Sequence, residues 1–250
     1  MVLKWVEQAQ SLFGVVLNEA QVAQFADYEA MLLDWNARFN LTAIRDLEGI
    51  RLKHFLDSLS CVMAFPSDLD EPNIIDVGTG AGFPGLPLKI VYPKSFLTLV
   101  ESIKKKANFC GELTRVLGLK RVLISSERAE TLGQDWEHRE FYDIALARAV
   151  AAMPTLVEYL LPLVKVGGRA IIQKGSSAKR VGCICAFASN ASDFWVEIPS
   201  PAASELRRVL RFCEKPAVAN LKKASVFASS IMGCSYKLSF STAESTSGAG

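Results

Sequence analysis

Three glycines at alternate positions, Gly78, Gly80 and Gly82, follow a short apolar stretch that includes an acid, Asp76. Glycine lets the backbone adopt a positive φ and approach a ligand closely, because it has no Cβ. A turn of this kind between a strand and a helix lies at the carboxyl end of a parallel sheet, where open α/β sheets bind ligands. The pattern therefore predicts a binding loop for a small molecule.

Two classes of cofactor use such loops. A dinucleotide loop has the spacing G-x-G-x-x-G, which lets a pyrophosphate lie at the N-terminus of the following helix. Here the spacing is G-x-G-x-G, and Phe83 stands where the third glycine of that pattern would be. The spacing favours S-adenosylmethionine, which has no pyrophosphate. An NAD-dependent oxidoreductase and a purely structural turn are the alternatives.

Polar residues follow the next expected strands in the same way. Glu101 ends the second strand, where its carboxylate can accept hydrogen bonds from both hydroxyls of a ribose, unless it is a solvated acid. Ala129 and Glu130 follow the third strand, at the expected adenine edge, with an exposed loop acid as the alternative. Arg148 follows the fourth strand and is expected to face the sulfonium and the substrate, or to form a structural ion pair with Asp143.

The elements that would position these residues alternate between strands and helices after residue 72. Strands are expected at 73–77, 96–100, 122–125, 142–147 and 169–173, and helices at 86–91, 104–117 and 154–164. The last helix is expected to end at Gly167 and Gly168. Such alternation indicates an α/β fold with a parallel sheet covered by helices on both faces.

The N-terminal part has a helical pattern instead. One helix is expected after Asn18 as its N-cap, and a second over residues 47–64. The polar, turn-rich segment near Pro66 marks a boundary. We therefore expect a helical cap at 1–65, a catalytic domain at 66–240 and a disordered tail at 241–250. Residues 225–240 are expected to hold one or two strands.

The composition excludes several classes of protein. The chain has 250 residues, of which 50% are hydrophobic and 22% charged, so it is a globular sequence and not a disordered one. Six cysteines without a C-x-x-C pair, together with two histidines, make a metal site unexpected. Neither a signal peptide nor a membrane-spanning stretch is recognisable. We expect a monomeric cytoplasmic protein with no membrane association.

Several motifs taken together resemble one known family. They are Trp35-Asn36, Asn40-Leu41-Thr42, Arg45-Asp46, His54, Leu56-Asp57-Ser58, the run DVGTGAGFPGLPL from Asp76, Arg148-Ala149-Val150-Ala151 and Lys174-Gly175. The combination is similar to the bacterial small-subunit ribosomal RNA methyltransferase G family, also called glucose-inhibited division protein B. The resemblance covers residues 18–176, and the stretch HREFYDIALARAV resembles cyanobacterial or plastid members.

The resemblance implies a Rossmann-like class I methyltransferase fold and N7 methylation of a guanosine in the 530 loop of 16S rRNA, either naked or in the small ribosomal subunit. It also implies cofactor contacts at Gly78, Phe83, Glu101, Ser102, Ile103, Ala129, Glu130 and Arg148. Guanine N7 has a lone pair and no proton, so its methylation requires alignment and no general base. His54 is therefore interpreted as a helical residue bonded to its neighbours and not as a base.

RNA binding would use phosphate contacts that weaken with salt. The candidate residues are Arg45, Arg51, Lys53, Lys104, Lys105 and Lys106. For the three lysines, a solvated helix start is the alternative. Trp35 and Phe39 are candidates for stacking on bases, with packing in the core as the alternative. Two other functions stay open: a methyltransferase of the same fold with a small-molecule substrate, and a non-catalytic ribosome-binding protein.

The sequence departs from the family after Gly175. Members usually continue with a helix, a strand and a closing hairpin that carries an arginine–histidine pair. No such segment is recognisable here, and Arg207-Arg208 lacks the expected surroundings. A divergent tail and a frameshifted tail are the two alternatives. The frameshifted tail predicts a sheet without its edge strands.

Overall fold

The computed structural model describes residues 4–66, 69–148, 153–174, 183–188 and 194–199. All of them belong to one compact unit, Met1–Leu210. The second unit, Arg211–Gly250, lies outside the described residues, as do the strands expected at 225–240 and the tail at 241–250. The domain boundary near residue 66 stays a prediction.

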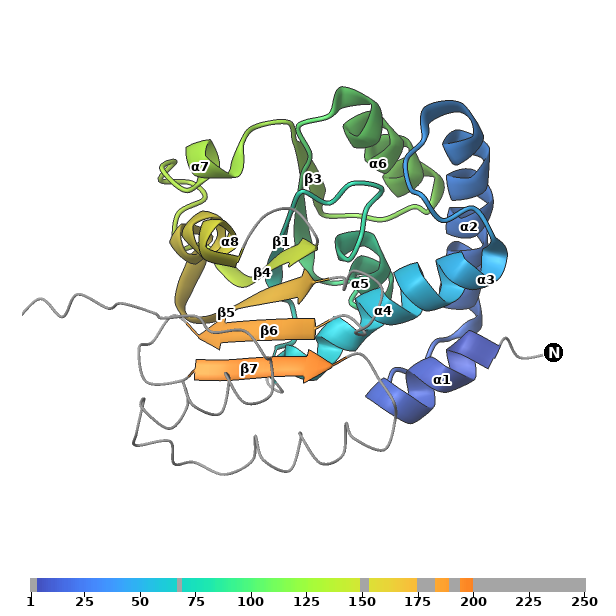
Figure 1. The fold of residues 1–250 in the computed structure, drawn as a ribbon, viewed down its shortest axis with the longest axis horizontal. Helices are drawn as coiled ribbons and strands as arrows, with labels where there is room; N and C mark the ends of the chain where they lie inside the picture. The colour runs from blue at the N-terminus through green and yellow to red at the C-terminus, as the bar shows by residue number, and fades with distance from the viewer. Residues whose placement is uncertain (1–3, 67–68, 149–152, 175–182, 189–193, 200–250) are drawn as a thin grey trace, which may run out of the picture. The chain divides into compact units, whose positions relative to one another are not determined.

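One sheet organises the described residues (Figure 1). Its strands are β1 (Asn73–Val77), β2 (Phe96–Val100), β3 (Val122–Ser125), β4 (Tyr142–Arg148), β5 (Val164–Lys174), β6 (Cys183–Ala188) and β7 (Phe194–Pro199), in the spatial order β3-β2-β1-β4-β5-β6-β7. Strands β1 to β5 pair in parallel, and β6 and β7 are antiparallel to their neighbours. The strand order reverses between β1 and β4, which is where an open α/β sheet binds its ligands.

Helices cover both faces of this sheet. The α-helices are α1 (Lys4–Phe13), α2 (Glu19–Phe39), α3 (Leu47–Ile50), α4 (Asp57–Leu59), α5 (Gly85–Val91), α6 (Lys104–Val116), α7 (Ala129–Leu132) and α8 (Met153–Leu160). Strand side chains alternate between two apolar clusters. Ile74 and Ile144 pack with α1, α2, α5 and α6, whereas Ile75 and Ala145 pack with α7 and α8. Figure 1 shows α7 and α8 apart from α2, α5 and α6.

The longest helix, α2, begins as the sequence predicts. The Asn18 side chain accepts a hydrogen bond from the Gln21 backbone, and the Gln21 side chain accepts one from the Asn18 backbone, which forms a capping box. Farther along the helix, the Tyr28 hydroxyl donates to the Ala81 carbonyl at 2.5 Å. The buried Tyr28 ring also stacks on Phe83, with 5.1 Å between ring centroids. Helix α2 is thereby bonded directly to the glycine loop.

Residues 47–64 are helical, as expected, but they do not form one regular α-helix. A π-helical turn, η1 (Arg51–Leu56), separates α3 from α4, and a 3₁₀ turn, η2 (Ser60–Ala64), follows α4. Each hydrogen bond of a π-turn spans one residue more than a hydrogen bond of an α-helix. The turn therefore changes the direction of the side chains that it carries. It carries His54, which the turn places beside the glycine loop.

The end that the sequence predicts for the helix over residues 154–164 is wrong. Helix α8 stops at Leu160, a 3₁₀ turn (η3, Leu161–Leu163) follows, and β5 already begins at Val164. Gly167 and Gly168 therefore lie within a strand. Gly167 has a φ of +85°, and the register of β5 against β4 shifts nearby, so the two glycines serve an irregular strand and not a helix end.

The antiparallel pair β6 and β7 corrects a second expectation. A frameshifted tail predicted a sheet that lacks its edge strands. In the structure, β6 pairs with β5 from Arg169 to Lys174, and β7 pairs with β6. None of the helices in the described ranges is long and apolar enough to cross a membrane.

Candidate active site

Hydrogen bonds to the Asp76 side chain hold the two ends of the glycine loop. Its Oδ2 atom accepts hydrogen bonds from the Thr79 hydroxyl at 2.6 Å and from the Gly85 backbone at 2.8 Å. The carboxyl is fully buried, and its Oδ1 atom has no hydrogen-bond partner among the described residues. Burial raises the pKa of Asp76 to about 6. The loop is thus built around a buried carboxyl that has one oxygen without a partner among the described residues.

Glu101, at the end of β2, closes the other side of the loop. This buried carboxylate accepts hydrogen bonds from the Gly80 backbone at 2.9 Å and from the Ile103 backbone at 2.8 Å. Each carboxylate oxygen has a second lone pair, so these bonds leave acceptor capacity for ribose hydroxyls. Ser102 and Ile103 are exposed next to it, at the start of α6.

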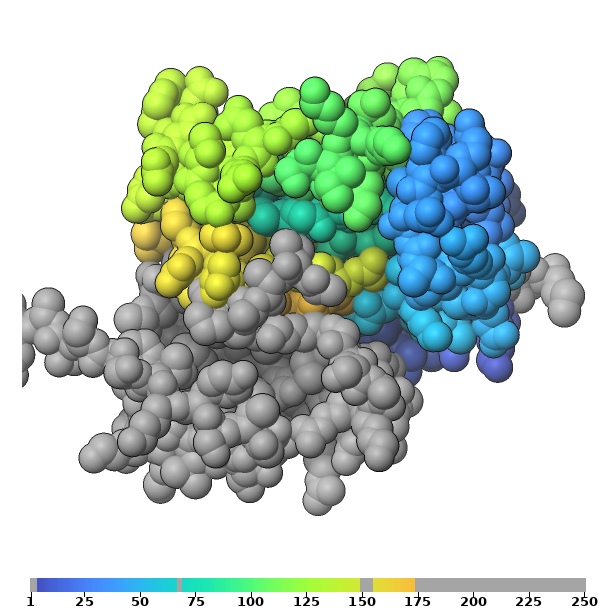
Figure 2. All heavy atoms as spheres, turned by 45° about the horizontal axis from the view of Figure 1, so that its top comes forward, coloured from blue at the N-terminus to red at the C-terminus, as the bar shows by residue number. Residues whose placement is uncertain are grey.

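The loop glycines fit the nucleoside cofactor that their spacing predicts. Gly78, Gly80 and Gly82 all have positive φ values, between 62° and 92°. A Cβ at Gly80 would meet no atom within 4 Å, whereas a Cβ at Gly82 would lie 2.4 Å from Leu86 and 2.7 Å from the Tyr28 hydroxyl. Gly80 therefore borders open space, and Gly82 is required for packing. Figure 2 shows teal atoms of the segment around residues 75–90 reaching the surface between green and blue regions.

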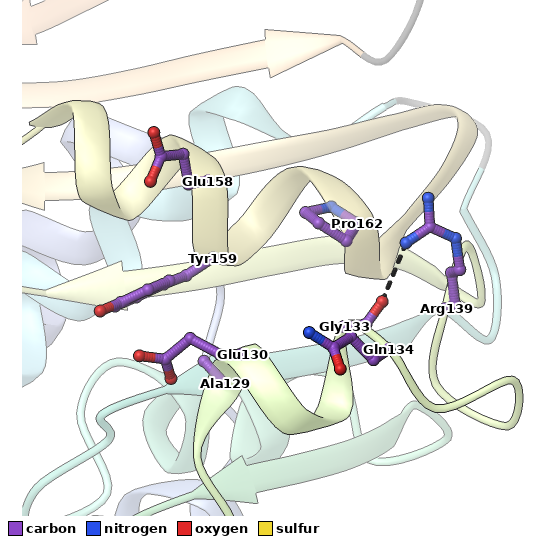
Figure 3. A pocket seen from close by; sticks show the side chains of 8 residues that line it. All are labelled: Ala129, Glu130, Gly133, Gln134, Arg139, Glu158, Tyr159 and Pro162. Carbon is purple, nitrogen blue, oxygen red and sulfur yellow. Dashed lines mark hydrogen bonds between the residues drawn. The ribbon is translucent and has the colours of Figure 1, made fainter.

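Ala129 and Glu130 lie at the start of α7, beyond the end of β3. The Ala129 side chain is buried, and the exposed Glu130 carboxylate accepts a hydrogen bond from Tyr159 of α8. The two residues line a cavity of about 320 Å³ together with Gly133, Gln134, Arg139, Glu158, Tyr159 and Pro162 (Figure 3). None of the loop glycines lines this cavity.

Arg148, at the carboxyl end of β4, lies over the ring of Phe83, with 5.0 Å from its guanidinium carbon to the ring centroid. The guanidinium also contacts Asp57 Oδ2 at 3.4 Å and His54 Nδ1 at 3.2 Å. The alternative ion pair with Asp143 is wrong. Asp143 instead accepts a hydrogen bond from the Asn73 backbone and pairs with Lys165, because its side chain lies at the other end of the strand.

His54 confirms its interpretation as a helical residue bonded to its neighbours. Its ring stacks on Phe83 with 4.4 Å between centroids, and its Nε2 atom lies 2.8 Å from the Thr42 hydroxyl. Burial and the adjacent Arg148 lower the pKa of His54 to about 3. A base of such low pKa, with both ring nitrogens already engaged, is unsuited to proton abstraction at neutral pH.

Sequence reasoning did not single out Gln173, which lies beside this cluster. It pairs with Arg148 across β4 and β5, and it is buried. Its Nε2 atom donates to the Asp57 carbonyl at 2.7 Å, and its Oε1 atom has no partner in the described part of the chain. The sequence could have indicated Gln173 by its position. It is a polar residue at the carboxyl end of the fifth strand, as Arg148 is at the end of the fourth.

The arrangement has its counterpart among known proteins. The sequence pattern of a family described as rRNA small subunit methyltransferase G matches residues 21–181, which is more than half of the chain. The chain belongs to this family. A protein named ribosomal RNA small subunit methyltransferase G from Roseiflexus sp. (strain RS-1) is 52% identical over 66% of this chain and 69% of its own length.

Two further relatives carry the same name. The protein from Alkaliphilus metalliredigens is 51% identical over 66% of this chain and 69% of its own length. The one from Acetivibrio thermocellus is 47% identical over 71% of this chain and 73% of its own length. The sheet of five parallel strands, with helices on both faces and N-terminal helices on one of them, is accordingly the Rossmann-like methyltransferase fold.

The basic residues expected to contact RNA in this methyltransferase family lie in different surroundings. Lys53, Lys104 and Lys105 are exposed, and the Lys105 ammonium lies 5.8 Å from the centroid of the Phe39 ring. Arg45 is exposed and bonds the Asn40 side chain at 2.8 Å. Phe39 is partly exposed, and its ring also lies near Trp35 and Arg38. Two of the residues are less accessible: Trp35 packs edge-on against the buried Phe109, and Lys106 is half-buried.

Arg51 differs from the others because its guanidinium is engaged within the protein. It forms two hydrogen bonds with the Glu29 carboxylate, at 2.6 and 2.9 Å, and Glu29 is largely buried. We expect Arg51→Ala to lower the free energy of unfolding by about 1–3 kcal/mol, since it leaves a carboxylate unpaired in a partly buried place. Denaturant unfolding measures this change.

Lys53→Ala is the matched control for Arg51→Ala, because it removes a neighbouring exposed cation from the same helical turn. Its effect on unfolding should be small. Glu29→Gln combined with Arg51→Ala should recover part of the lost stability. Equal unfolding midpoints for Arg51→Ala and Lys53→Ala would contradict a structural role for Arg51.

Proposed function

We propose that this chain transfers the methyl group of S-adenosylmethionine to N7 of a guanosine in the 530 loop of 16S rRNA. The observation that carries the proposal is the loop between β1 and α5, where open space at Gly80 lies against the Glu101 carboxylate. The family and the names of its relatives support the substrate class.

The residues at the carboxyl ends of the strands would each bind a different part of the cofactor. Glu101 would accept the ribose hydroxyls, and the buried Asp76 would support the loop through its bonds to Thr79 and Gly85. Gly78 and Gly80 permit close approach of the ligand to the backbone. Ala129 and Glu130 lie near the end of β3, where the adenine edge is expected. These roles extend the expectations drawn from the sequence.

When bound, S-adenosylmethionine supplies a sulfonium methyl group that the N7 lone pair of guanine can accept without a proton transfer. The protein therefore has to align the base and exclude other acceptors. Arg148 lies at the strand end next to the loop, and its guanidinium is a donor that suits phosphate or the guanine edge. The neutral, fully engaged His54 agrees with a reaction that needs no base.

One exposed cation near the start of α6 suits an RNA substrate. Lys105 and Phe39 place a cation beside an exposed aromatic ring, a combination that binds phosphates and stacks on unpaired bases. A protein with this substrate acts where ribosomal subunits are assembled. We therefore extend the proposal to a cytoplasmic location, and the monomeric state stays a prediction.

The test begins with calorimetric titration of S-adenosylmethionine into the full chain. Radiolabelled methyl transfer to 16S rRNA, both naked and in small subunits, follows, and strand cleavage at 7-methylguanosine locates the label. Label at one guanosine of the 530 loop supports the proposal. Cofactor binding without rRNA labelling favours a small-molecule methyltransferase. Ribosome binding without cofactor binding favours a non-catalytic protein.

A further inference from the structure

Four groups from separate parts of the chain converge on the Arg148 side chain. The Phe83 ring lies under the guanidinium, and the Asp57 carboxylate and the Lys53 carbonyl each lie 3.4 Å from Nη1. The fourth group is His54 Nδ1, at 3.2 Å from Nη2. Phe83 belongs to the glycine loop, and the other three belong to the η1 and α4 turns. Arg148 is thus held between the N-terminal helices and the cofactor loop.

The direction of the His54–Arg148 hydrogen bond fixes the protonation of the imidazole. A guanidinium only donates, so His54 Nδ1 must be the acceptor and carries no proton. The single proton of the neutral ring then lies on Nε2, which donates to the Thr42 hydroxyl at 2.8 Å. The Thr42 hydroxyl oxygen also accepts a hydrogen bond from the Ile44 backbone at 3.2 Å.

A second set of bonds fixes Thr42 itself. The Thr42 backbone donates to the Asn36 side chain at 2.9 Å, and Asn36 is buried in the last turn of α2. The Asn36 amide in turn donates to the Ile44 carbonyl at 3.3 Å. A continuous series of bonds therefore runs from α2 through Thr42 and His54 to Arg148.

We propose that His54 is a positioning residue, which as a neutral imidazole accepts a hydrogen bond from Arg148 and, together with Asp57, holds the guanidinium on Phe83 at the methyl-transfer site. The inference rests on the proposed function, because that function gives Arg148 its role. Arg148 is the group that would contact substrate or cofactor. His54 acts only through it.

Burial and the adjacent Arg148 favour the neutral form of His54. Arg148 from β4 faces it directly, Asp57 from α4 contacts the same guanidinium, and Asp76 from β1 interacts electrostatically with Arg148. Protonation would remove the acceptor and place a second cation beside Arg148. The Lys53 backbone carbonyl acts in the opposite direction but is the smallest of the three causes, so the pKa of His54 falls to about 3. The imidazole acceptor of the His54–Arg148 hydrogen bond is therefore present throughout the neutral range.

The sign of the pH effect on stability follows from this low pKa. Between about pH 6.5 and pH 3, an unfolded chain binds a proton at this histidine and the folded chain does not. The contribution of His54 to stability is therefore present above pH 6.5 and is lost as the pH falls toward 3. Asp76, whose pKa is raised to about 6, acts in the opposite direction over about pH 4–6.

The state of the imidazole can be measured without any substrate. The chain has two histidines, so long-range ¹H–¹⁵N spectra of the full-length protein contain two imidazole patterns, which His138→Gln assigns. We expect His54 to show the Nε2–H tautomer and to stay neutral from pH 8 to about pH 5. In Arg148→Ala its pKa should rise, because a neighbouring cation is lost. The Nδ1–H tautomer, or titration near pH 6.5, would overturn the proposal.

Two substitutions separate the acceptor from the ring. His54→Asn keeps an acceptor near the Nδ1 position, whereas His54→Phe keeps a ring that can stack on Phe83 but has no acceptor. We expect His54→Phe to lower kcat by about 10- to 100-fold with little change in KM, and His54→Asn to recover most of that loss. Equal activity of both variants, with both folded, would overturn a positioning role. If the wild-type chain methylates no rRNA, the proposed function fails, while the spectra still decide the state of His54.

Discussion

Gly80→Asp is expected to weaken the binding of S-adenosylmethionine by at least about 100-fold while the protein remains folded. A Cβ at Gly80 meets no atom within 4 Å, so the new side chain would extend into the open space beside the loop. Its carboxylate would also lie near that of Glu101, which accepts a hydrogen bond from the Gly80 backbone. Steric overlap with the ligand and repulsion between like charges act together. Calorimetric titration of the cofactor measures the loss.

Gly118→Asp provides a closely matched control. Gly118 also has a positive φ, of 64° against 62° for Gly80, and a Cβ there also meets nothing within 4 Å. It lies just after α6, outside the glycine loop, so the strain of an aspartate in the left-handed region is similar and the effect on binding should be absent. If Gly80→Asp bound S-adenosylmethionine with wild-type affinity, the assignment of the loop to the cofactor site would be wrong.

Arg148→Ala should lower the rate of methyl transfer by about 100-fold or more and reduce folding stability much less. The substitution removes the group that lies between Phe83 and Asp57 at the end of β4. Arg148→Lys should recover little, because an ammonium cannot present the planar donor pair that contacts His54 and Asp57 together. Single-turnover methyl transfer, with thermal unfolding in parallel, measures both effects.

The control for Arg148→Ala is Arg169→Ala, in the neighbouring strand. Arg169 donates to the Ala64 carbonyl at 2.8 Å and pairs with Ile144, away from the carboxyl end of β4. Its loss removes a guanidinium from the same sheet without touching the site, so turnover should persist in the folded protein. Wild-type turnover in Arg148→Ala would exclude Arg148 from the reaction.

Features that depend on neighbouring residues could be predicted from the sequence. The G-x-G-x-G loop, its flanking strands and the N-cap at Asn18 all follow from residues a few positions apart. Glu101 was predictable for a related reason, since it ends a strand next to the first one. Gly167 and Gly168 show the limit of local patterns. A glycine pair can end a helix or interrupt a strand, and only the pairing of β5 with β4 distinguishes the two.

The partners of the charged residues could not be predicted in this way. Arg148 meets Asp57, which lies 91 residues earlier, and Arg51 meets Glu29 on another helix. Such pairs depend on how the N-terminal helices pack on the sheet, which no spacing in the sequence reveals. The pairing of Arg148 with Asp143 was plausible from proximity along the chain. It fails because the two side chains lie at opposite ends of one strand.

The packing of the N-terminal helices on the sheet affects whether the fold tolerates truncation. Trp5 of α1, Phe25 of α2 and Ile144 of β4 belong to one apolar cluster, so the N-terminal helices and the sheet share a core in the described part of the chain. Layers that share a core melt as one cooperative unit and are poor modules for recombination or truncation. A destabilising substitution in the first helix therefore lowers the fraction of molecules in which the cofactor loop is folded. It does so although the helix lies far from that loop in the sequence.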